Sequence, residues 1–126
     1  MTSAAPRRSL NVALWALQVL VAVPFVAAGS GKLLGTPEMI ALFDAVGIGQ
    51  WFRYVTGVLE VLGALLLIFP GLTALGAVVL GVVMACASGC HLTVLDAAPT
   101  APLVLLALTA LIAWGRRSQL ARLAGS

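Results

Sequence analysis

The fold is decided by one short stretch, Phe25–Leu33, which reads FVAAGSGKL. In this stretch a long apolar segment ends in small residues and then in Lys32, the only lysine of the chain. A second apolar segment carries a single carboxylate, Glu60, within the sequence GVLEVLG. A charge inside an apolar segment is costly unless it meets a partner of opposite sign. We therefore expect these two residues to organise the packing of their segments.

The composition places the chain in the membrane class. Of its 126 residues, 62% are hydrophobic and only 9% are charged, and the mean hydropathy is +1.14. Soluble domains carry about 25% charged residues, and a small one must cover its core with polar groups. The length allows one compact unit, which we place at residues 10–115. An integral membrane protein is predicted, with the lipid bilayer as its surroundings.

Four apolar segments are expected to cross the membrane as helices, at residues 10–29, 54–69, 72–90 and 101–115. A bilayer core of about 30 Å needs about 20 helical residues. The first segment has a cleaved signal peptide as its alternative, but its apolar run exceeds the usual 7–15 or so residues, which favours a retained helix. The prediction is an all-α integral membrane four-helix bundle.

A short helix is predicted at residues 37–46, between the first and second spanning helices. Thr36 fits the N-cap, Pro37 the first helical position, and Glu38 the positive end of the helix dipole. About ten residues are too few to span, so this helix is expected to lie at the membrane interface. The aromatic and basic cluster at residues 51–54 follows it, as is typical of headgroup depth.

The arginines predict the orientation. Two of them lie in the N-terminal tail, residues 1–9, and three in the C-terminal basic tail, residues 116–126. The loops on the other side balance their cations against acids, Asp96 among them. By the positive-inside rule both termini lie in the cytoplasm. Because the arginines lie where membrane topology and anionic headgroups would use them, we expect no nucleic-acid partner.

The candidate charged pair consists of Glu60 with either Lys32 or Arg53. Glu60 lies about 8 Å inside the second spanning helix, at 1.5 Å per residue. Lys32 reaches it from the first helix, whereas Arg53 lies seven residues earlier on the same face. Such a pair either only locks two helices together or, with His91 nearby, forms a proton or ligand site. The sequence leaves both interpretations open.

The two cysteines, Cys86 and Cys90, lie one helical turn apart, where a disulfide would strain an intact helix. A metal site made of both thiols and His91 is a weak alternative, and no metal site is predicted. The role of the thiols stays open. Small residues at close helix contacts are expected to be packing positions. They are Gly29, Gly31, Gly63, Ala77, Gly81, Ala85 and Gly89.

These features, in this order, resemble the DoxX-like family of small bacterial four-helix membrane proteins. The matching pieces run from about residue 10 to 117 and are Phe25-x-x-Ala28-Gly29-x-x-Lys32-Leu33, Pro37-Glu38, Gly57-x-x-Glu60-x-x-Gly63, His91, and Ala101–Leu106 followed by Arg116-Arg117. The resemblance implies a multi-pass protein of the bacterial cytoplasmic membrane. It makes Lys32 and Glu60 the characteristic charged positions, while Cys86 and Cys90 lie outside the pattern.

The resemblance also implies a function. The family name is tied to a small subunit of an archaeal thiosulfate:quinone oxidoreductase, and some relatives are linked to oxidative or thiol stress. The expectation is an accessory, quinone-associated subunit beside a membrane or peripheral redox enzyme, without independent catalysis. Quinone is the one cofactor implied. The alternatives are a binder or transporter of a small amphiphilic molecule, and a scaffold without chemistry; the oligomeric state is not predicted.

Overall fold

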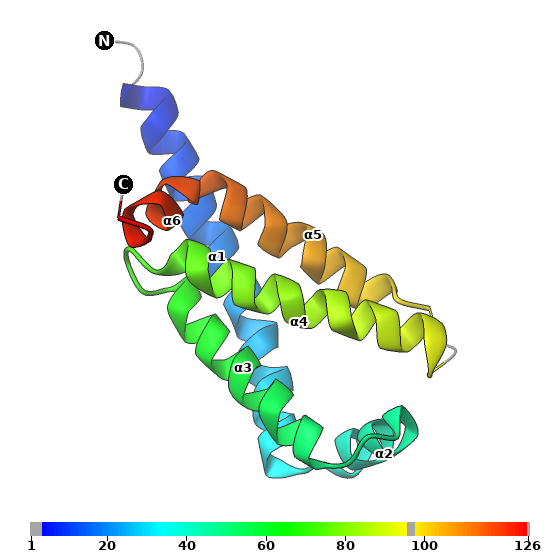
Figure 1. Ribbon diagram of the computed structural model, residues 1–126. Helices are drawn as coiled ribbons and strands as arrows, with labels where there is room; N and C mark the ends of the chain where they lie inside the picture. The colour runs from blue at the N-terminus through cyan, green and yellow to red at the C-terminus, as the bar shows by residue number, and fades with distance from the viewer. Residues whose placement is uncertain (1–3, 96–97, 126) are drawn as a thin grey trace.

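The computed structural model describes residues 4–95 and 98–125, and every regular element in this part of the chain is a helix (Figure 1). The helices are α1 (Ala4–Leu34), α2 (Pro37–Val46), α3 (Trp51–Leu67), α4 (Thr73–Thr93), α5 (Thr100–Gly115) and α6 (Arg117–Leu123). The all-α prediction is confirmed. Asp96, predicted for the loop before the last spanning helix, lies outside the described residues.

Among the described residues, two helices are long and apolar enough to cross a membrane: α1 over Arg7–Leu34, and α4. A third crossing results if α5 and α6, which are bent by 65° at their junction, count as one span. The helix α1 is longer than the predicted segment 10–29, because Pro6 lies in its first turn, where proline is tolerated, and Lys32 suits its negative end. The predicted basic tail likewise contains a helix, α6.

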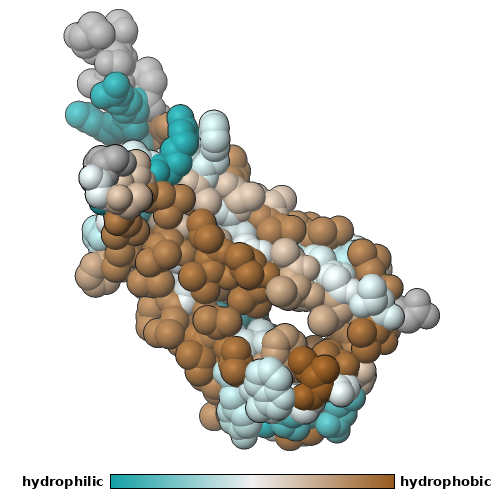
Figure 2. Space-filling view, in the orientation of Figure 1, coloured by the Kyte–Doolittle hydropathy of each residue, from teal (hydrophilic) through white to brown (hydrophobic). Residues whose placement is uncertain are grey.

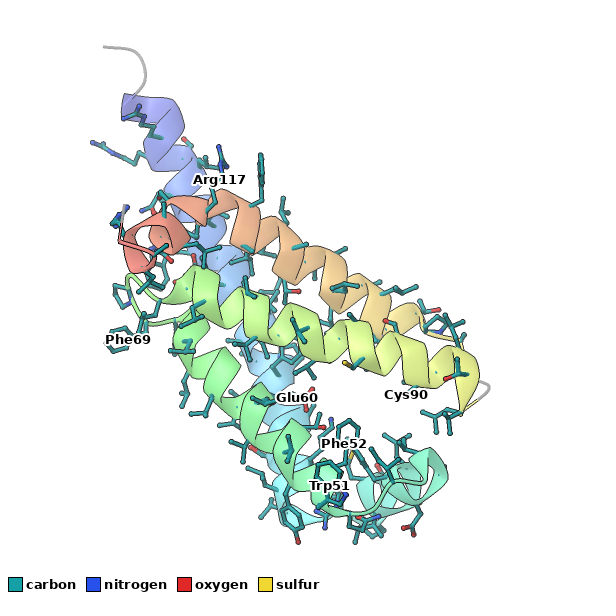
Figure 3. All side chains as sticks on the ribbon, viewed as in Figure 1. Trp51, Phe52, Glu60, Phe69, Cys90 and Arg117 are labelled. Atoms are coloured by element: carbon teal, nitrogen blue, oxygen red, sulfur yellow. The ribbon has the colours of Figure 1, made fainter. Side chains whose placement is uncertain are left out.

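The long helices form a wedge. In Figure 1, α1 lies beside α3 and α4 lies beside α5, and the two pairs converge at one end and diverge at the other. The closed end holds the turn of residues 68–72, the start of α1 and α6, with Phe69 and Arg117 there in Figure 3. The open end holds α2, with Trp51 and Phe52 beside it (Figure 3).

The hydrophobic core fills the closed half of the wedge. Its largest members come from all four long helices: Phe25 of α1, Leu67 of α3, Leu80 of α4 and Ile112 of α5, each at most 1% exposed. Three of these lie in the half of their helix nearer the closed end. Tight apolar packing therefore holds the helices together at the closed end and decreases toward the open end.

Glycines let α3 approach both of its neighbours. A Cβ atom added to Gly29 would lie 2.9 Å from the carbonyl oxygen of Gly57, so α1 and α3 nearly touch by their backbones. A Cβ added to Gly76 would likewise lie 2.7 Å from the carbonyl oxygen of Gly63, between α4 and α3. The structure thus places the predicted packing residues Gly29 and Gly63 at helix contacts. The partner glycine of each, Gly57 or Gly76, was not predicted.

The predicted packing residues on α4 form a seam of small residues, Ala77, Gly81, Ala85 and Gly89. Only the first half of this seam lies at helix contacts. Ala77 is buried, and a Cβ on Gly81 would lie 3.4 Å from the Thr109 hydroxyl of α5. The packing prediction is wrong for Ala85, which is exposed, and for Gly89, which has open space around it. A four-residue repeat drifts about 40° per step around a helix of 3.6 residues per turn, so the seam leaves the contact face. A Cβ added to Gly31 would meet the Thr36 side chain at 3.9 Å and no other long helix among the described residues.

A buried polar network ties the closed end together. Gln18 of α1 donates to the carbonyl oxygen of Leu67 at 2.9 Å and accepts from Arg116 at 2.9 Å. Arg116 also donates to the side-chain oxygen of Asn11 at 2.7 Å. The Gln119 side chain accepts from the backbone N–H of Ala74 at 2.9 Å, which satisfies a donor in the first turn of α4. These bonds join α1 to α3 and to the junction of α5 and α6, and they join α4 to α6.

Candidate functional site

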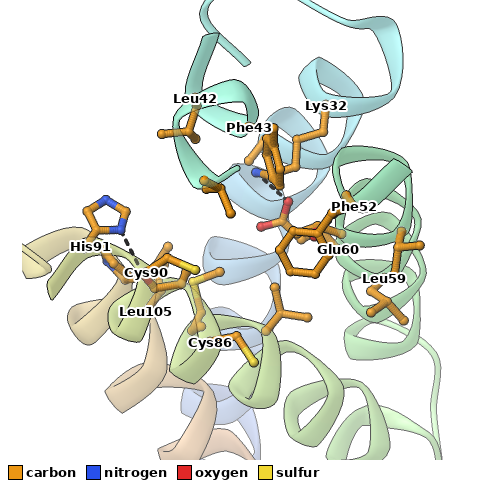
Figure 4. Close-up of a pocket in the computed structure, with 18 of the residues that line it drawn as sticks. Lys32, Leu42, Phe43, Phe52, Leu59, Glu60, Cys86, Cys90, His91 and Leu105 are labelled. Carbon is orange, nitrogen blue, oxygen red and sulfur yellow. Dashed lines mark hydrogen bonds and ion pairs between the residues drawn. The ribbon is translucent and has the colours of Figure 1, made fainter. Parts of the chain in front are cut away.

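A cavity of about 330 Å³ lies at the open end of the wedge. Figure 2 shows the molecule hollowed here, between α2 and α4, and Figure 4 shows the side chains around the hollow. Its walls come from α1 and α3 on one side and from α4 and α5 on the other, and α2 covers it. Most of the lining is apolar. The volume is at the lower end of the range of about 300–1,000 Å³ that small-molecule sites occupy.

Lys32 and Glu60 form an ion pair on one wall of this pocket. The Lys32 ammonium nitrogen lies 2.8 Å from Oε1 of Glu60, and the Glu60 residue is only 2% exposed. Each stem passes a glycine of the opposite helix: a Cβ on Gly57 would lie 3.0 Å from Cβ of Lys32, and one on Gly29 would lie 3.1 Å from Cβ of Glu60. The two glycines therefore let the two charges meet inside an apolar helix pair.

Arg53 has a different role from the alternative that the sequence left open. Its guanidinium donates to the backbone carbonyl of Lys32 and, at 2.6 Å, to the side-chain oxygen of Gln50. It also stacks over the Tyr54 ring at 4.3 Å. The last carbonyls of a helix lack partners and carry the negative end of its dipole, so this cation stabilises the end of α1. Seven residues along α3 are about 10.5 Å, which separates Arg53 from the level of Glu60.

The Glu60 carboxylate keeps unused hydrogen-bonding capacity. Oε1 is buried 2.8 Å from the Lys32 ammonium, and no other donor among the described residues bonds to it. Figure 4 shows the carboxylate at the wall of the cavity. A carboxylate has about four lone-pair sites on its two oxygens, so the group can accept a further hydrogen bond from a molecule in the pocket.

His91 lines the same pocket from α4, on the wall opposite Glu60 (Figure 4). Its Nδ1 lies 2.9 Å from the carbonyl oxygen of Ala87. A carbonyl oxygen only accepts, so Nδ1 carries the proton, and Nε2 of the neutral ring is an acceptor. The structure thus brings the two residues of the predicted proton or ligand site, Glu60 and His91, to one cavity.

Both cysteines also line the pocket, and both are free thiols. Cys86 is exposed, and Cys90, which faces α3 across the open end in Figure 3, is half-buried. Within residues 4–95 and 98–125, no group of three or more His, Cys, Asp or Glu side chains is placed to hold a metal ion. The thiols are therefore available to an occupant of the pocket as weak polar neighbours.

The cover of the pocket was not predicted from the sequence. Leu42, Phe43 and Val46 of α2 line it, and the rings of Phe43 and Phe52 meet edge to face with centroids 5.8 Å apart. The apolar side of α2 was visible in the sequence, but we assigned it to the membrane interface. No local pattern distinguishes a side that faces lipid from one that faces a cavity, because the cavity exists only where the helix pairs diverge.

In the described residues, the fold and this site define a small all-helical membrane protein with a pocket between its helices. The chain belongs to the DoxX-like family, whose model matches residues 16–113. This range includes Lys32, Glu60 and His91, and it confirms the resemblance inferred from their spacing. No match was found among curated proteins, and none among solved structures.

Proposed function

We propose that the pocket at the open end binds a quinone-class molecule, and that the chain serves as a quinone-associated subunit of a membrane redox system. The observation that supports this proposal is the placement of the buried Lys32–Glu60 pair and His91 on opposite walls of an apolar pocket. A quinone headgroup is a flat apolar ring with oxygens at opposite edges. Apolar walls with a few convergent polar groups suit such a ring.

The proposed role is binding beside a redox enzyme, without catalysis by the chain alone. Lys32, Glu60 and His91 can hydrogen-bond a ligand and exchange protons, but none of them carries electrons. Cys86 and Cys90 lie one turn apart on α4, a spacing at which a disulfide strains the helix. Electron transfer therefore falls to a partner enzyme in the membrane or at its periphery. Purification in native lipids should recover that enzyme together with the chain.

We infer four membrane crossings, by α1, α3, α4 and α5, with α2 at the interface and both termini in the cytoplasm of a bacterial cell. The helix α3 has 17 residues, about 26 Å at 1.5 Å per residue, which a bilayer accommodates by local thinning. Five arginines and no acidic residue fall in residues 1–9 and 116–126, as the positive-inside rule requires. The pocket then opens toward the outer side. A reporter that fluoresces only in the cytoplasm should work at both termini; fluorescence at one terminus alone would contradict this topology.

A matched pair of substitutions on α4 tests the pocket. Ala87→Phe places a ring into the cavity that Ala87 lines, whereas Ala85→Phe adds the same ring to an exposed position outside the lining. Binding of a short-chain quinone to the purified protein in lipid nanodiscs should fall at least about tenfold in the first variant, a loss of about 1.4 kcal/mol, and remain unchanged in the second. Thermal unfolding of both variants controls for folding. Equal binding by the wild type and by Ala87→Phe would rule out this pocket.

The alternative functions predict other outcomes of the same experiment. A general binder of amphiphiles would take up alkyl phenols and fatty alcohols as tightly as quinones, and all of them would be displaced by Ala87→Phe. A scaffold would bind none of these molecules. The small number of polar groups in the lining keeps the general binder as the second candidate.

A further inference from the structure

We propose that the pocket prefers the reduced form of its ligand, a hydroquinone, over the oxidised quinone. This inference rests on the proposed function and adds to it the redox state that the site selects. A hydroquinone carries two O–H donors at opposite edges of its ring, whereas a quinone carries two carbonyl acceptors there. The polar groups on the two walls of the pocket decide between them.

Glu60 is an acceptor on the first wall. Glu60 lies 2.8 Å from the Lys32 ammonium, and the carboxylate of such an ion pair accepts hydrogen bonds but donates none. Beyond the Lys32 ammonium, no other donor among the described residues bonds to its buried Oε1. A hydroquinone hydroxyl can donate to the lone pairs that remain on the carboxylate, while a quinone carbonyl would place one acceptor against another.

Two further acceptors line the pocket. His91 uses its Nδ1 proton on the carbonyl oxygen of Ala87, which leaves Nε2 of the neutral ring as an acceptor on the second wall. The Thr56 hydroxyl donates to the carbonyl oxygen of Phe52 at 2.8 Å, so its oxygen offers only lone pairs to the cavity. In both residues the donor is already used within the chain's own helices.

Lys32 is the strong donor among the polar side chains of the described lining. Its ammonium is directed at Glu60 by the 2.8 Å contact, so a quinone carbonyl near Lys32 must also lie near the carboxylate. A quinone carbonyl that accepts a hydrogen bond from Lys32 therefore also lies against the Glu60 carboxylate, which is another acceptor. The balance of the two walls favours a ligand that donates at both edges.

The preference for the hydroquinone can be measured as a ratio of two binding affinities. We expect decylubiquinol to bind at least about tenfold more tightly than decylubiquinone. A tenfold preference for the reduced form raises the midpoint potential of the bound couple by about 30 mV, because that is the shift per factor of ten for two electrons. The probes are these two compounds, bound without oxygen to the chain of residues 1–126 in nanodiscs.

Three variants test whether the acceptors of the pocket cause the preference for the hydroquinone. Glu60→Gln exchanges an acceptor-only group for an amide that also donates, and it should shift the preference toward the quinone. Because this change leaves Lys32 without its partner, His91→Phe and Thr56→Val serve as independent variants that each remove one acceptor and keep the ion pair. Each should reduce the preference for the quinol several-fold. Ala85→Phe, outside the lining, should keep it unchanged.

The outcomes separate the two proposals. If neither compound binds, the proposed function fails and this inference fails with it. If both bind equally, or the quinone binds more tightly, the pocket function stands and the inference is overturned. If the quinol binds more tightly but all three acceptor variants retain the wild-type preference, the assignment to these residues is wrong. Quinol preference that is lost in the acceptor variants supports the inference.

Discussion

At Gly57, a Cβ atom would lie 3.0 Å from the Gly29 carbonyl oxygen, from Cβ of Lys32 and from Cγ of Leu33. Such distances are shorter than nearly all contacts of real Cβ atoms, and two of these three neighbours sit at or next to the backbone, where little can move. The ion pair of the pocket therefore depends on two residues without side chains. Glycine is used here for close approach, since Gly29 and Gly57 both lie within helices.

We predict that Gly57→Ala destabilises the protein by about 1–3 kcal/mol, the usual cost of an extra methyl group in a tight contact. Gly89→Ala is the matched control, because Gly89 is also helical but has open space around it. Alanine in a helix is favoured over glycine by about 0.5–1 kcal/mol, so the control should be slightly more stable than the wild type. Unfolding in mixed micelles measures both. Equal stability of the two variants would refute the close contact.

Removing one charge of the ion pair should lower the free energy of unfolding more than removing both charges. Lys32→Met leaves Glu60 as a buried charge without a partner, and we expect a loss of about 3–5 kcal/mol. Lys32→Met combined with Glu60→Leu removes both charges and should cost clearly less than the single change. The same unfolding assay compares the two. If the double variant is as unstable as the single one, the side-chain stems and not the charges hold these helices together.

The sequence predicted that Glu60 pairs with Lys32 or Arg53, because opposite charges in apolar segments have few other ways to be satisfied. It could not choose between Lys32 and Arg53, since that choice depends on how far α1 extends past α3. Gly57 and Gly76 were missed for a similar reason. A glycine in a helix shows that close approach is allowed, but not which neighbouring helix makes use of it.

At the scale of the elements, α2 is a separate cover fastened by a chain of hydrogen bonds. Gly35 and Gly47, with φ of 71° and 90°, bound it at both ends. Gln50 donates to the carbonyl oxygen of Ile40 at 3.0 Å and to the Asp44 carboxylate at 2.8 Å. It also accepts from Arg53, which in turn holds the end of α1. One side chain thus links the cover to the two helices that carry the ion pair.

We predict that Gln50→Ala loosens α2 without unfolding the rest. Two hydrogen bonds from Gln50 to α2 are lost, at about 0.5–1.5 kcal/mol each, so amide hydrogen exchange within α2 should become at least about tenfold faster. Thr93→Ala is the control, because the Thr93 hydroxyl bonds only to the Gly89 carbonyl of its own helix. Exchange in α2 that is equally slow in both variants would show that apolar contacts alone hold the cover.

The bounds of α2 could be predicted from the residues at its two ends, whereas its role as the cover of the pocket could not. Thr36 accepts from the N–H of Met39, Pro37 begins the helix, and Gly47 ends it in a left-handed conformation, so each boundary is a local effect. The placement of Phe43 over a cavity depends on the angle between α3 and α4. That angle results from the Gly63–Gly76 contact near the closed end, far from α2 in the sequence.

At the scale of the whole molecule, the two ends of the wedge have opposite characters. The closed end has a filled core and a satisfied polar network around Gln18, which is completely buried. The open end has a cavity with the buried Lys32–Glu60 ion pair on its wall. Stability is concentrated at one end and the capacity to bind at the other. Composition and hydropathy predicted the helices and the membrane, but they could not predict this division, which depends on how the helix pairs converge.

Arg116 should therefore matter for the stability of the whole molecule. Arg116→Ala removes the bonds to Gln18 and Asn11 that join α1 to the end of α5, and we expect a loss of about 1.5–3 kcal/mol. Arg117→Ala is the control, because Arg117 stacks on Trp114 and donates to its carbonyl within the same turn. It should change stability by less than about 0.5 kcal/mol. Similar losses in both variants would indicate a general effect of positive charge at this end.

The distance between Lys32 and Glu60 in the chain has a consequence for biosynthesis. The two residues are 28 positions apart. At about 5–20 residues per second, a ribosome releases Lys32 one or more seconds before Glu60. During that interval α1 ends in a cation whose partner has not yet been made, so its final position in the bilayer must await α3. Nascent chains stalled before Glu60 emerges should leave α1 crosslinkable to the insertion machinery, and chains stalled after α3 has emerged should release it.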